Sequence, residues 1–296
     1  MKPWNQTDIE AWLKDQTIKR SYQDEVVTKI LALKNQFDII EYGSLSYSAL
    51  RYPLFLIKTK NFDKNKKTIL ITGGVHGYET SGVHGALAFF EREVVKFDDM
   101  FNFICAPCVS PWAYETINRW NAKALDPNRC FYSNGPSEEC SLFLEAVSSV
   151  HDQLFAHFDL HETTDTDNSI FRPALEKRDA VKQEIWEIPD GFYIVGDTAN
   201  PQPGFQKAVI AAVKKVTHIA PGDKNGMIIG VPLEQEGVIN YNFKKLFLCA
   251  GLSNSEYTTT TEVYPDSPKV TDALCVDAQV AAVRGGVEYL KNIQAD

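Results

Sequence analysis

The sequence predicts an α/β fold in which helices cover both faces of a twisted, largely parallel sheet. Apolar, β-branched runs such as 68–72 are typical of buried strands, and amphipathic patterns such as 22–33 are typical of helices. Strands and helices alternate along the chain, which is the pattern of a parallel sheet. The 296 residues are 44% hydrophobic and 23% charged, enough for a sizeable core. We therefore expect one domain over 1–296, with an N-terminal helical addition over about 1–36.

The elements are expected in the following order. Two helices lie within 7–34, and Thr7 with Glu10 resembles a capping box at the start of the first. Strands are expected near 37–42, 52–59, 67–72, 101–106, 154–160 and 257–261. Helices are expected near 79–95, 111–118, 136–151 with Ser137 as its cap, 174–186, 204–215 and 271–293. The segment 165–245 is rich in Gly, Pro and Asp, so long surface loops, often lids or specificity loops, are predicted around its helices.

Charge and composition exclude several classes of partner. The formal net charge is −9, which disfavours nucleic acid and anionic membranes. No apolar run approaches the length needed to span a bilayer, and residues 1–6 lack the apolar core of a signal peptide. We expect a soluble, cytoplasmic protein that binds neither nucleic acid nor membrane.

The six cysteines are scattered over a long chain, which indicates reduced thiols. Cys105 and Cys108 have the C-x-x-C spacing of a redox pair. Such a pair needs its first thiol at a helix N-terminus, and Ser110 and Pro111 intervene before the next helical pattern. We interpret both as structural cysteines, with a thiol oxidoreductase as a competing hypothesis.

A candidate metal site begins where the strand near 67–72 gives way to a helix. Gly73 and Gly74 allow a tight turn, and His76 and Glu79 follow within it. An imidazole and a carboxylate three residues apart can converge on Zn²⁺. A turn histidine and a first-turn glutamate that favours the helix dipole would give the same pattern.

Later strand ends add candidates of the same kind. His161 ends the strand near 154–160, at the sheet edge where His76 is expected, and Asp159 within that strand could be its partner. His157 is interpreted as part of the strand's polar face. Glu262 ends a Thr-rich strand and could be a general base, although a strand-end glutamate is commonly only exposed.

Two arginines supply the remaining chemistry. Arg119 and Arg129, the latter after Asn128, could bind a carboxylate and stabilise an oxyanion beside a metal. Surface salt bridges are the alternative.

The order of these residues resembles that of the zinc metallocarboxypeptidase family, which also includes aspartoacylase and succinylglutamate desuccinylase. The resemblance covers roughly 67–293 and implies a three-layer αβα sandwich with a mixed, largely parallel sheet. It is carried by Gly74-Val75-His76-Gly77-Tyr78-Glu79, Asp126-Pro127-Asn128-Arg129, Asp159-Leu160-His161 and Thr261-Glu262. Two departures are Pro127, where the family usually has Leu, and Ser110-Pro111-Trp112-Ala113, where many members have N-P-D-G.

The resemblance also implies roles. One Zn²⁺ per chain is held by His76, Glu79 and His161, and Glu262 is the catalytic glutamate. The remaining roles are oxyanion stabilisation by Arg119, binding of the substrate carboxylate by Asn128 and Arg129, and a mobile tyrosine at Tyr241 or Tyr257, of which we favour Tyr241.

Three functions follow from these residues. The first is a metallocarboxypeptidase that hydrolyses the C-terminal peptide bond through a metal-activated water. The second is an N-acyl amino acid deacylase, since the stretch 159–164 also looks like aspartoacylase. Those deacylases carry a β-rich domain after the catalytic glutamate, whereas the residues after Glu262 here pattern as one helix. The third is a binding protein that kept the fold, which would be expected to have lost a ligand or the base.

Overall fold

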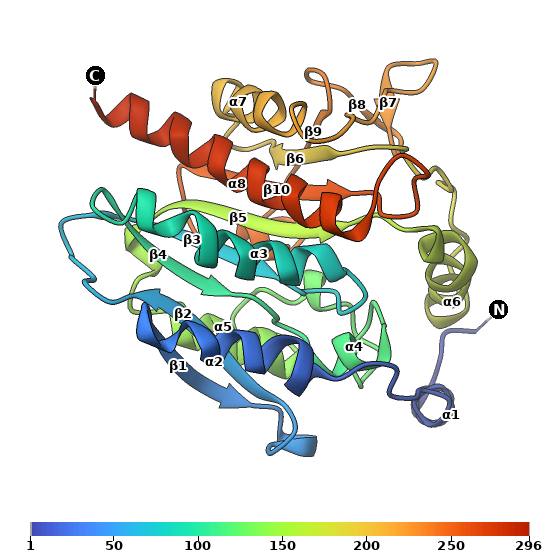
Figure 1. Cartoon of the computed structure of the whole chain (residues 1–296). Helices are drawn as coiled ribbons and strands as arrows, with labels where there is room; N and C mark the ends of the chain where they lie inside the picture. The colour runs from blue at the N-terminus through green and yellow to red at the C-terminus, as the bar shows by residue number, and fades with distance from the viewer. Residues whose placement is uncertain (1, 296) are drawn as a thin grey trace.

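The computed structural model describes residues 2–295, and within them eight strands form one mixed sheet (Figure 1). The strand order is β1-β2-β4-β3-β5-β10-β6-β9. A separate two-stranded sheet joins β7 to β8. The strands are β1 (Phe37–Ser44), β2 (Pro53–Thr59), β3 (Lys67–Gly73), β4 (Phe101–Ala106), β5 (Leu154–Glu162), β6 (Tyr193–Asp197), β7 (Met227–Ile228), β8 (Val231–Pro232), β9 (Val238–Tyr241) and β10 (Tyr257–Val263).

The centre of the sheet is parallel and its flanks are mixed. Strands β4, β3, β5 and β10 pair in parallel, so their carboxyl ends meet at one edge. The pairs β1–β2, β2–β4 and β10–β6 are antiparallel, and β6–β9 is parallel again. Ligands bind in the crevice outside such carboxyl ends in open α/β sheets. The predicted α/β sandwich with a mixed, largely parallel sheet is confirmed.

Helices cover both faces of the sheet, as the alternation of β3 side chains requires. Ile69 and Ile71 join the core under α2, α3, α7 and α8, whereas Leu70 joins a second core that includes Phe143 of α5. Figure 1 shows α3 and α8 lying across the front of the sheet. The helices are α1 (Gln6–Lys14), α2 (Thr28–Ala32), α3 (Thr80–Arg92), α4 (Pro111–Thr116), α5 (Glu138–Val147), α6 (Arg172–Asp179), α7 (Pro203–Val213) and α8 (Asp272–Ala295).

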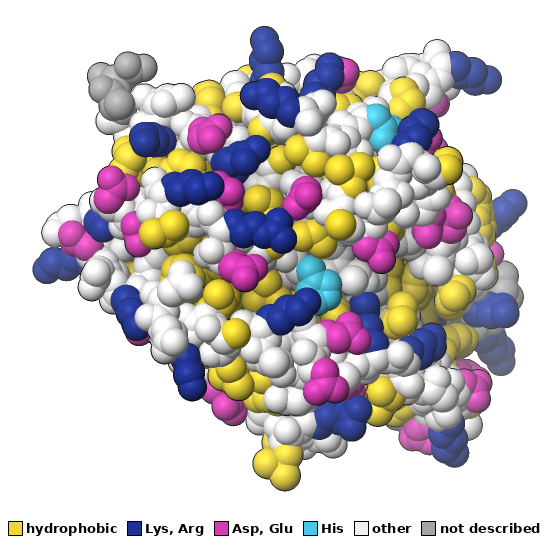
Figure 2. Space-filling model, viewed as in Figure 1, with side chains coloured by type: hydrophobic (Ala, Val, Ile, Leu, Met, Phe, Trp, Pro, Cys, Tyr) yellow, Lys and Arg dark blue, Asp and Glu magenta, His cyan; other side chains and the backbone are white. Residues whose placement is uncertain are grey.

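The surface over α2, α3 and α8 mixes charges of both signs. Figure 2 shows lysine, arginine, aspartate and glutamate side chains interspersed over this face. Across residues 2–295, every helix is too short or too polar to cross a membrane.

The predicted strands and most helices are confirmed, with three corrections. Asn5, not Thr7, caps α1, and its capping box uses Asp8. Helix α6 ends at Asp179, not near 186, because Ala180 adopts a left-handed conformation with φ of 56°. The predicted long loops of 165–245 contain strands β6 and β9, which extend the sheet beyond β10.

Two glycines shape the turn between β3 and α3. Gly74 has φ of +60°, a conformation that disfavours other residues. Gly77 lies so close to α4 that a Cβ atom there would be 1.9 Å from the carbonyl carbon of Ala113. This contact fixes the loop that carries His76 at the carboxyl edge of the sheet.

Candidate active site

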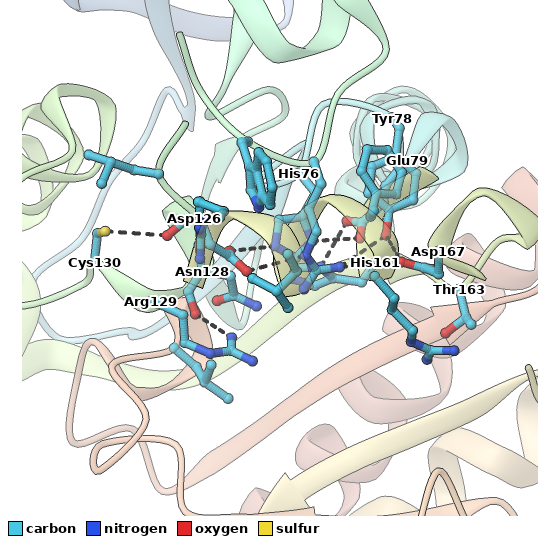
Figure 3. A pocket seen from close by; sticks show the side chains of 18 of the residues that line it. His76, Tyr78, Glu79, Asp126, Asn128, Arg129, Cys130, His161, Thr163 and Asp167 are labelled. Carbon is cyan, nitrogen blue, oxygen red and sulfur yellow. Dashed lines mark hydrogen bonds and ion pairs between the residues drawn. The ribbon is translucent and has the colours of Figure 1, made fainter. Parts of the chain in front are cut away.

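Three side chains of potential metal ligands converge at the carboxyl edge of the sheet (Figure 3). His76 follows β3, Glu79 lies at the start of α3, and His161 lies near the end of β5. Their residues are only 2%, 1% and 1% exposed. Glu79 Oε1 lies 2.7 Å from His76 Nδ1, and its Oε2 lies 2.8 Å from His161 Nδ1. The sequence therefore placed all three residues in one cluster correctly.

The donor set fits a cation such as Zn²⁺. Glu79 Oε2 is buried 2.8 Å from His161 Nδ1, in an ion-pair contact that lacks hydrogen-bond geometry. A buried carboxylate is costly unless positive charge compensates it. Burial opposes ionisation of Glu79, but the two imidazoles outweigh it and lower its pKa to about 2. Two imidazole nitrogens and one carboxylate form a typical catalytic zinc donor set.

The outer nitrogens of both histidines are held by carboxylates. His76 Nε2 lies 2.9 Å from Asp126 Oδ1, and His161 Nε2 lies 2.8 Å from Asp159 Oδ2. Asp159 in turn accepts a hydrogen bond of 2.6 Å from the Thr72 hydroxyl. If a cation replaced the protons between the imidazoles and Glu79, each outer N–H could still donate to its carboxylate, and each Nδ1 would present a lone pair to the cation. This arrangement orients both rings for metal binding.

Arg119 lies beside the metal ligands in a network of its own. Its Nε donates to Asp126 Oδ2 at 3.2 Å, and its NH1 donates to the Tyr78 hydroxyl at 3.1 Å. The same NH1 lies 3.6 Å from Asp167 Oδ1, which accepts a hydrogen bond from Tyr78. Burial would lower the pKa of Arg119, but Asp126 raises it, so the guanidinium stays charged.

Glu262 lies on the neighbouring strand. Parallel pairing of β10 with β5 sets Glu262 opposite His161. Its Oε2 accepts a hydrogen bond of 3.0 Å from the Thr163 hydroxyl. Burial raises the pKa of the Glu262 carboxyl to about 7. A half-buried carboxyl with a pKa near neutrality can accept and return a proton at neutral pH.

Asn128 and Arg129 lie on one side of the triad in Figure 3, and Tyr78 and Asp167 lie on the other. The Asn128 side-chain oxygen accepts a 2.8 Å hydrogen bond from the Cys249 backbone N–H, which fixes its orientation. Arg129 is exposed, and its NH1 donates to the Asn128 carbonyl at 2.6 Å. Its guanidinium forms no ion pair with the described carboxylates within 4.0 Å.

All eight predicted site residues line one cleft of about 1060 Å³. Tyr241 is among its lining residues. The other tyrosine considered, Tyr257, is buried against Phe155 and Phe205 in the main core. The structure thus separates the two tyrosines.

The contacts that several residues of the site make were not predicted from the sequence. Tyr78 and Asp167 bind each other and Arg119, and Asp126 binds both His76 and Arg119. Asp126 was noticed only as part of the motif that contains Arg129. Asp167 lies in a segment without periodicity, so its approach to Tyr78 depends on tertiary structure alone.

Glu162 follows His161 in the sequence, but its side chain contacts the start of α3 and not the ligand triad. Its two carboxylate oxygens accept hydrogen bonds from the backbone of Ser81 and Thr80, at 2.6 and 3.2 Å. Burial raises its pKa to about 7. Glu162 therefore binds the first turn of α3, the helix that begins next to Glu79.

Cys105 and Cys108 are both buried and free. Burial raises the pKa of Cys108 to about 12 and that of Cys105 well above its usual value. A redox pair requires a thiol with a lowered pKa. The environment of these cysteines is that of structural thiols.

The sequence matches no known protein-family profile and no curated protein. Solved structures do match. A protein from Shewanella amazonensis, provisionally assigned as a metallopeptidase, aligns over 93% of this chain and 99% of its own, with a TM-score of 0.69 and 18% identity. Bovine thrombin-activatable fibrinolysis inhibitor, solved with a tick carboxypeptidase inhibitor, aligns over 98% of both chains (TM-score 0.57, 13% identity).

A metallo-carboxypeptidase from Pseudomonas aeruginosa also aligns, over 98% of this chain and 70% of its own, with a TM-score of 0.58 and 13% identity. The chain therefore has the α/β fold of the metallo-carboxypeptidases, as its motifs predicted. At these identities the likeness establishes the fold, and the activity has to be argued from the site.

Proposed function

We propose that this protein is a zinc-dependent metallocarboxypeptidase that hydrolyses the C-terminal peptide bond of peptides. The observation that carries the proposal is the meeting of three features in one cleft. These are the convergent ligand triad with its buried Glu79 carboxylate, the Glu262 carboxyl with its raised pKa, and the exposed guanidinium of Arg129. A metal site, a base and a carboxylate anchor are what an exopeptidase needs.

His76, Glu79 and His161 would hold the ion. Zn²⁺ bound there would lower the pKa of a water molecule and polarise the scissile carbonyl. Glu262 would accept the proton of that water and return it to the leaving amine. Arg119, charged and held by Asp126, would donate hydrogen bonds to the oxyanion.

Asn128 and Arg129 would fix the substrate. A guanidinium can bind an α-carboxylate through two parallel hydrogen bonds. Because Arg129 and Glu262 line the same cleft, a peptide bound by its terminal carboxylate would present its last peptide bond to the reaction centre. Tyr241 lines the cleft as well, and we assign it to substrate binding.

An N-acyl amino acid deacylase is the second candidate, because it uses the same donor set and a free carboxylate. The discriminating assay offers three substrates: a peptide with a free C-terminus, its C-terminal amide, and N-acetylaspartate. A carboxypeptidase turns over the first and leaves the other two largely intact. Preference for N-acetylaspartate would establish the deacylase instead.

The role of Arg129 has a separate test. Truncating one partner of a desolvated charge pair costs about 2–5 kcal/mol, or roughly 30- to 3000-fold in kcat/KM. We expect losses in this range for Arg129→Ala with a free peptide, and for the wild-type protein with the amide. Combining both changes should cost much less than their sum, because both remove one contact. Equal cleavage of peptide and amide would contradict the role of Arg129.

A further inference from the structure

Helix α6 extends along the cleft. Five residues at its start and along its length line that cavity, at the spacing of a single helix face. They are Phe171, Arg172, Leu175, Arg178 and Asp179. No residue of α6 itself is buried, so this face borders an open cavity and not a packed core.

The N-terminal end of α6 lies beside the metal ligands. Phe171 stacks on Tyr78 with ring centroids 4.7 Å apart, at an interplanar angle of 28°. The Tyr78 hydroxyl donates to Asp167, in the turn that precedes α6, at 3.0 Å. Tyr78 lies next to Glu79 in the turn between β3 and α3, so its contacts hold this end of α6 beside the metal ligands.

The N-terminal segment holds the other end. The Trp4 backbone N–H donates to the Arg178 carbonyl at 2.8 Å, which satisfies an acceptor in the last turn of α6. The Arg178 guanidinium lies over the Trp120 ring at 4.4 Å and donates to the Ala124 carbonyl at 2.9 Å. Trp4 packs edge-on against the same Trp120 ring, with centroids 5.9 Å apart. Figure 1 shows the N-terminal segment and α6 on the same side of the molecule.

The N-terminal segment is itself anchored to the body of the protein. Trp12 of α1 contacts Trp112 and Trp120, with ring centroids 6.0 and 5.7 Å apart. Farther along, the Gln16 side chain accepts a 2.7 Å hydrogen bond from Asn118. Pro3, Trp4 and Ile9 of this segment line the cleft together with His76 and Glu262. The segment is thus a fixed part of the cavity wall.

We propose that α6 and residues 3–9, which we call the rim, close the outer end of the cleft and select short substrates over long peptides. This inference rests on the proposed function. The eight residues of α6 span about 12 Å, the length of three to four extended residues. A substrate bound by its carboxylate near Arg129 would therefore run along α6 for a few residues and then meet residues 3–9 at its far end. Blocked dipeptides and N-acyl amino acids fit within it, whereas longer chains would have to displace it.

The test compares N-acetylated peptides of two, four and eight residues that share their last two residues. We expect kcat/KM of the wild-type protein to fall about tenfold or more from the shortest to the longest. Trp4→Ala and Ile9→Ala each remove part of the rim and should raise the long-to-short ratio about three- to tenfold. Ile18→Ala is the matched control, because Ile18 is exposed in the same segment and does not line the cleft. It should leave the ratio unchanged.

A binding measurement separates this inference from the proposed function. The same peptides are titrated calorimetrically into Glu262→Gln protein, with and without the rim substitutions. Suppose that the wild-type protein hydrolyses no peptide, but Kd still rises with peptide length and the rim substitutions remove that rise. The role of the rim would then be supported and the peptidase proposal would fail. Equal Kd and equal kcat/KM for peptides of all lengths would contradict the proposed role of the rim. The absence of binding by any peptide would contradict it as well. Thermal melting checks folding, and Ile9→Ala carries the test if Trp4→Ala does not fold.

Discussion

Strand β5 contributes to two triads of side chains that could ligate a metal, and the two differ in access. They are His76, Glu79 and His161, and His157, Asp159 and Cys249. Both are buried and bring potential ligand atoms within 4.8 Å of one another. The first triad lines the cleft, whereas no member of the second does. We refer to them as the cleft triad and the inner triad.

The charges of the side chains distinguish the triads further. In the inner triad the Thr72 hydroxyl lies 2.6 Å from Asp159 Oδ1, 2.9 Å from His157 Nε2 and 3.5 Å from Cys249 Sγ. Burial lowers the pKa of His157 to about 4 and raises that of the Cys249 thiol. A thiol must lose its proton to bind a metal. In the cleft triad, by contrast, the pKa of Glu79 is lowered to about 2, so this ligand is already an anion.

The difference teaches that residue type and proximity do not by themselves define a metal centre. Access from the cleft and the charge of the ligand side chains decide which triad can bind an ion. Asp159 belongs to the inner triad and also binds His161 of the cleft triad. The inner triad is therefore best understood as a support for the outer nitrogen of a metal ligand.

The largest expected effect is the loss of metal from the cleft triad. His161→Ala removes a ligand, so we expect bound zinc to fall from about one ion per chain to nearly none, with loss of activity. His157→Ala is the matched control, from the same strand and the inner triad, and should keep its zinc. Metal analysis of both purified proteins measures this. Full occupancy in His161→Ala, or loss only in His157→Ala, would reverse the comparison.

A smaller but still large effect is expected at Glu262. Glu262→Gln should keep its zinc and lose about 10²- to 10⁴-fold in kcat, because general base catalysis contributes that much. The wild-type kcat/KM should fall as pH decreases through the pKa of Glu262, since the base must be ionised. Burial sets that pKa at about 7, and a bound cation would lower it. The variant should lack this acidic limb.

The neighbouring glutamate provides the control for that experiment. Glu162→Gln should retain most of kcat, because Glu162 binds the backbone of α3 and its loss affects mainly stability. Steady-state kinetics over pH 5 to 9 and thermal melting measure both variants. Near-normal kcat in Glu262→Gln, together with a large loss in Glu162→Gln, would transfer the role of base to Glu162.

The sequence was sufficient for the cleft triad because its residues follow or end recognisable strands. An apolar run closed by glycines located His76, and the strand that ends near Leu160 located His161. Parallel strands bring their carboxyl ends to one edge, so convergence followed from the fold class. A different argument indicated a partner for Asp159, because an unpaired charge in an apolar strand is costly, and the structure places it 2.8 Å from His161.

The sequence was insufficient where a feature depends on tertiary structure and has no local sequence pattern. Strand β6 is a short apolar run within a segment rich in Gly, Pro and Asp, so neither period nor length marked it as a strand. The contact between Tyr78 and Asp167 joins residues 89 positions apart and has no local signal. The rim was equally invisible, because the Trp4 hydrogen bond to Arg178 involves backbone atoms only.

The smallest expected effects separate Asp159 from Cys249 within the inner triad. Asp159→Asn replaces the carboxylate that holds His161 Nε2, and loss of such a partner typically costs about 10- to 100-fold in metal affinity. Cys249→Ser removes only a weak contact with Thr72, so metal affinity and kcat should stay within about threefold. Competition with a zinc chelator measures both affinities, and circular dichroism confirms folding. If Asp159 supports His161, the asparagine variant should be weakened and the serine variant should not. Equal loss of zinc affinity in both variants would mean that the inner triad acts on the site as one packed unit. Loss of zinc affinity only in Cys249→Ser would mean that the thiol, and not the carboxylate, supports the metal site.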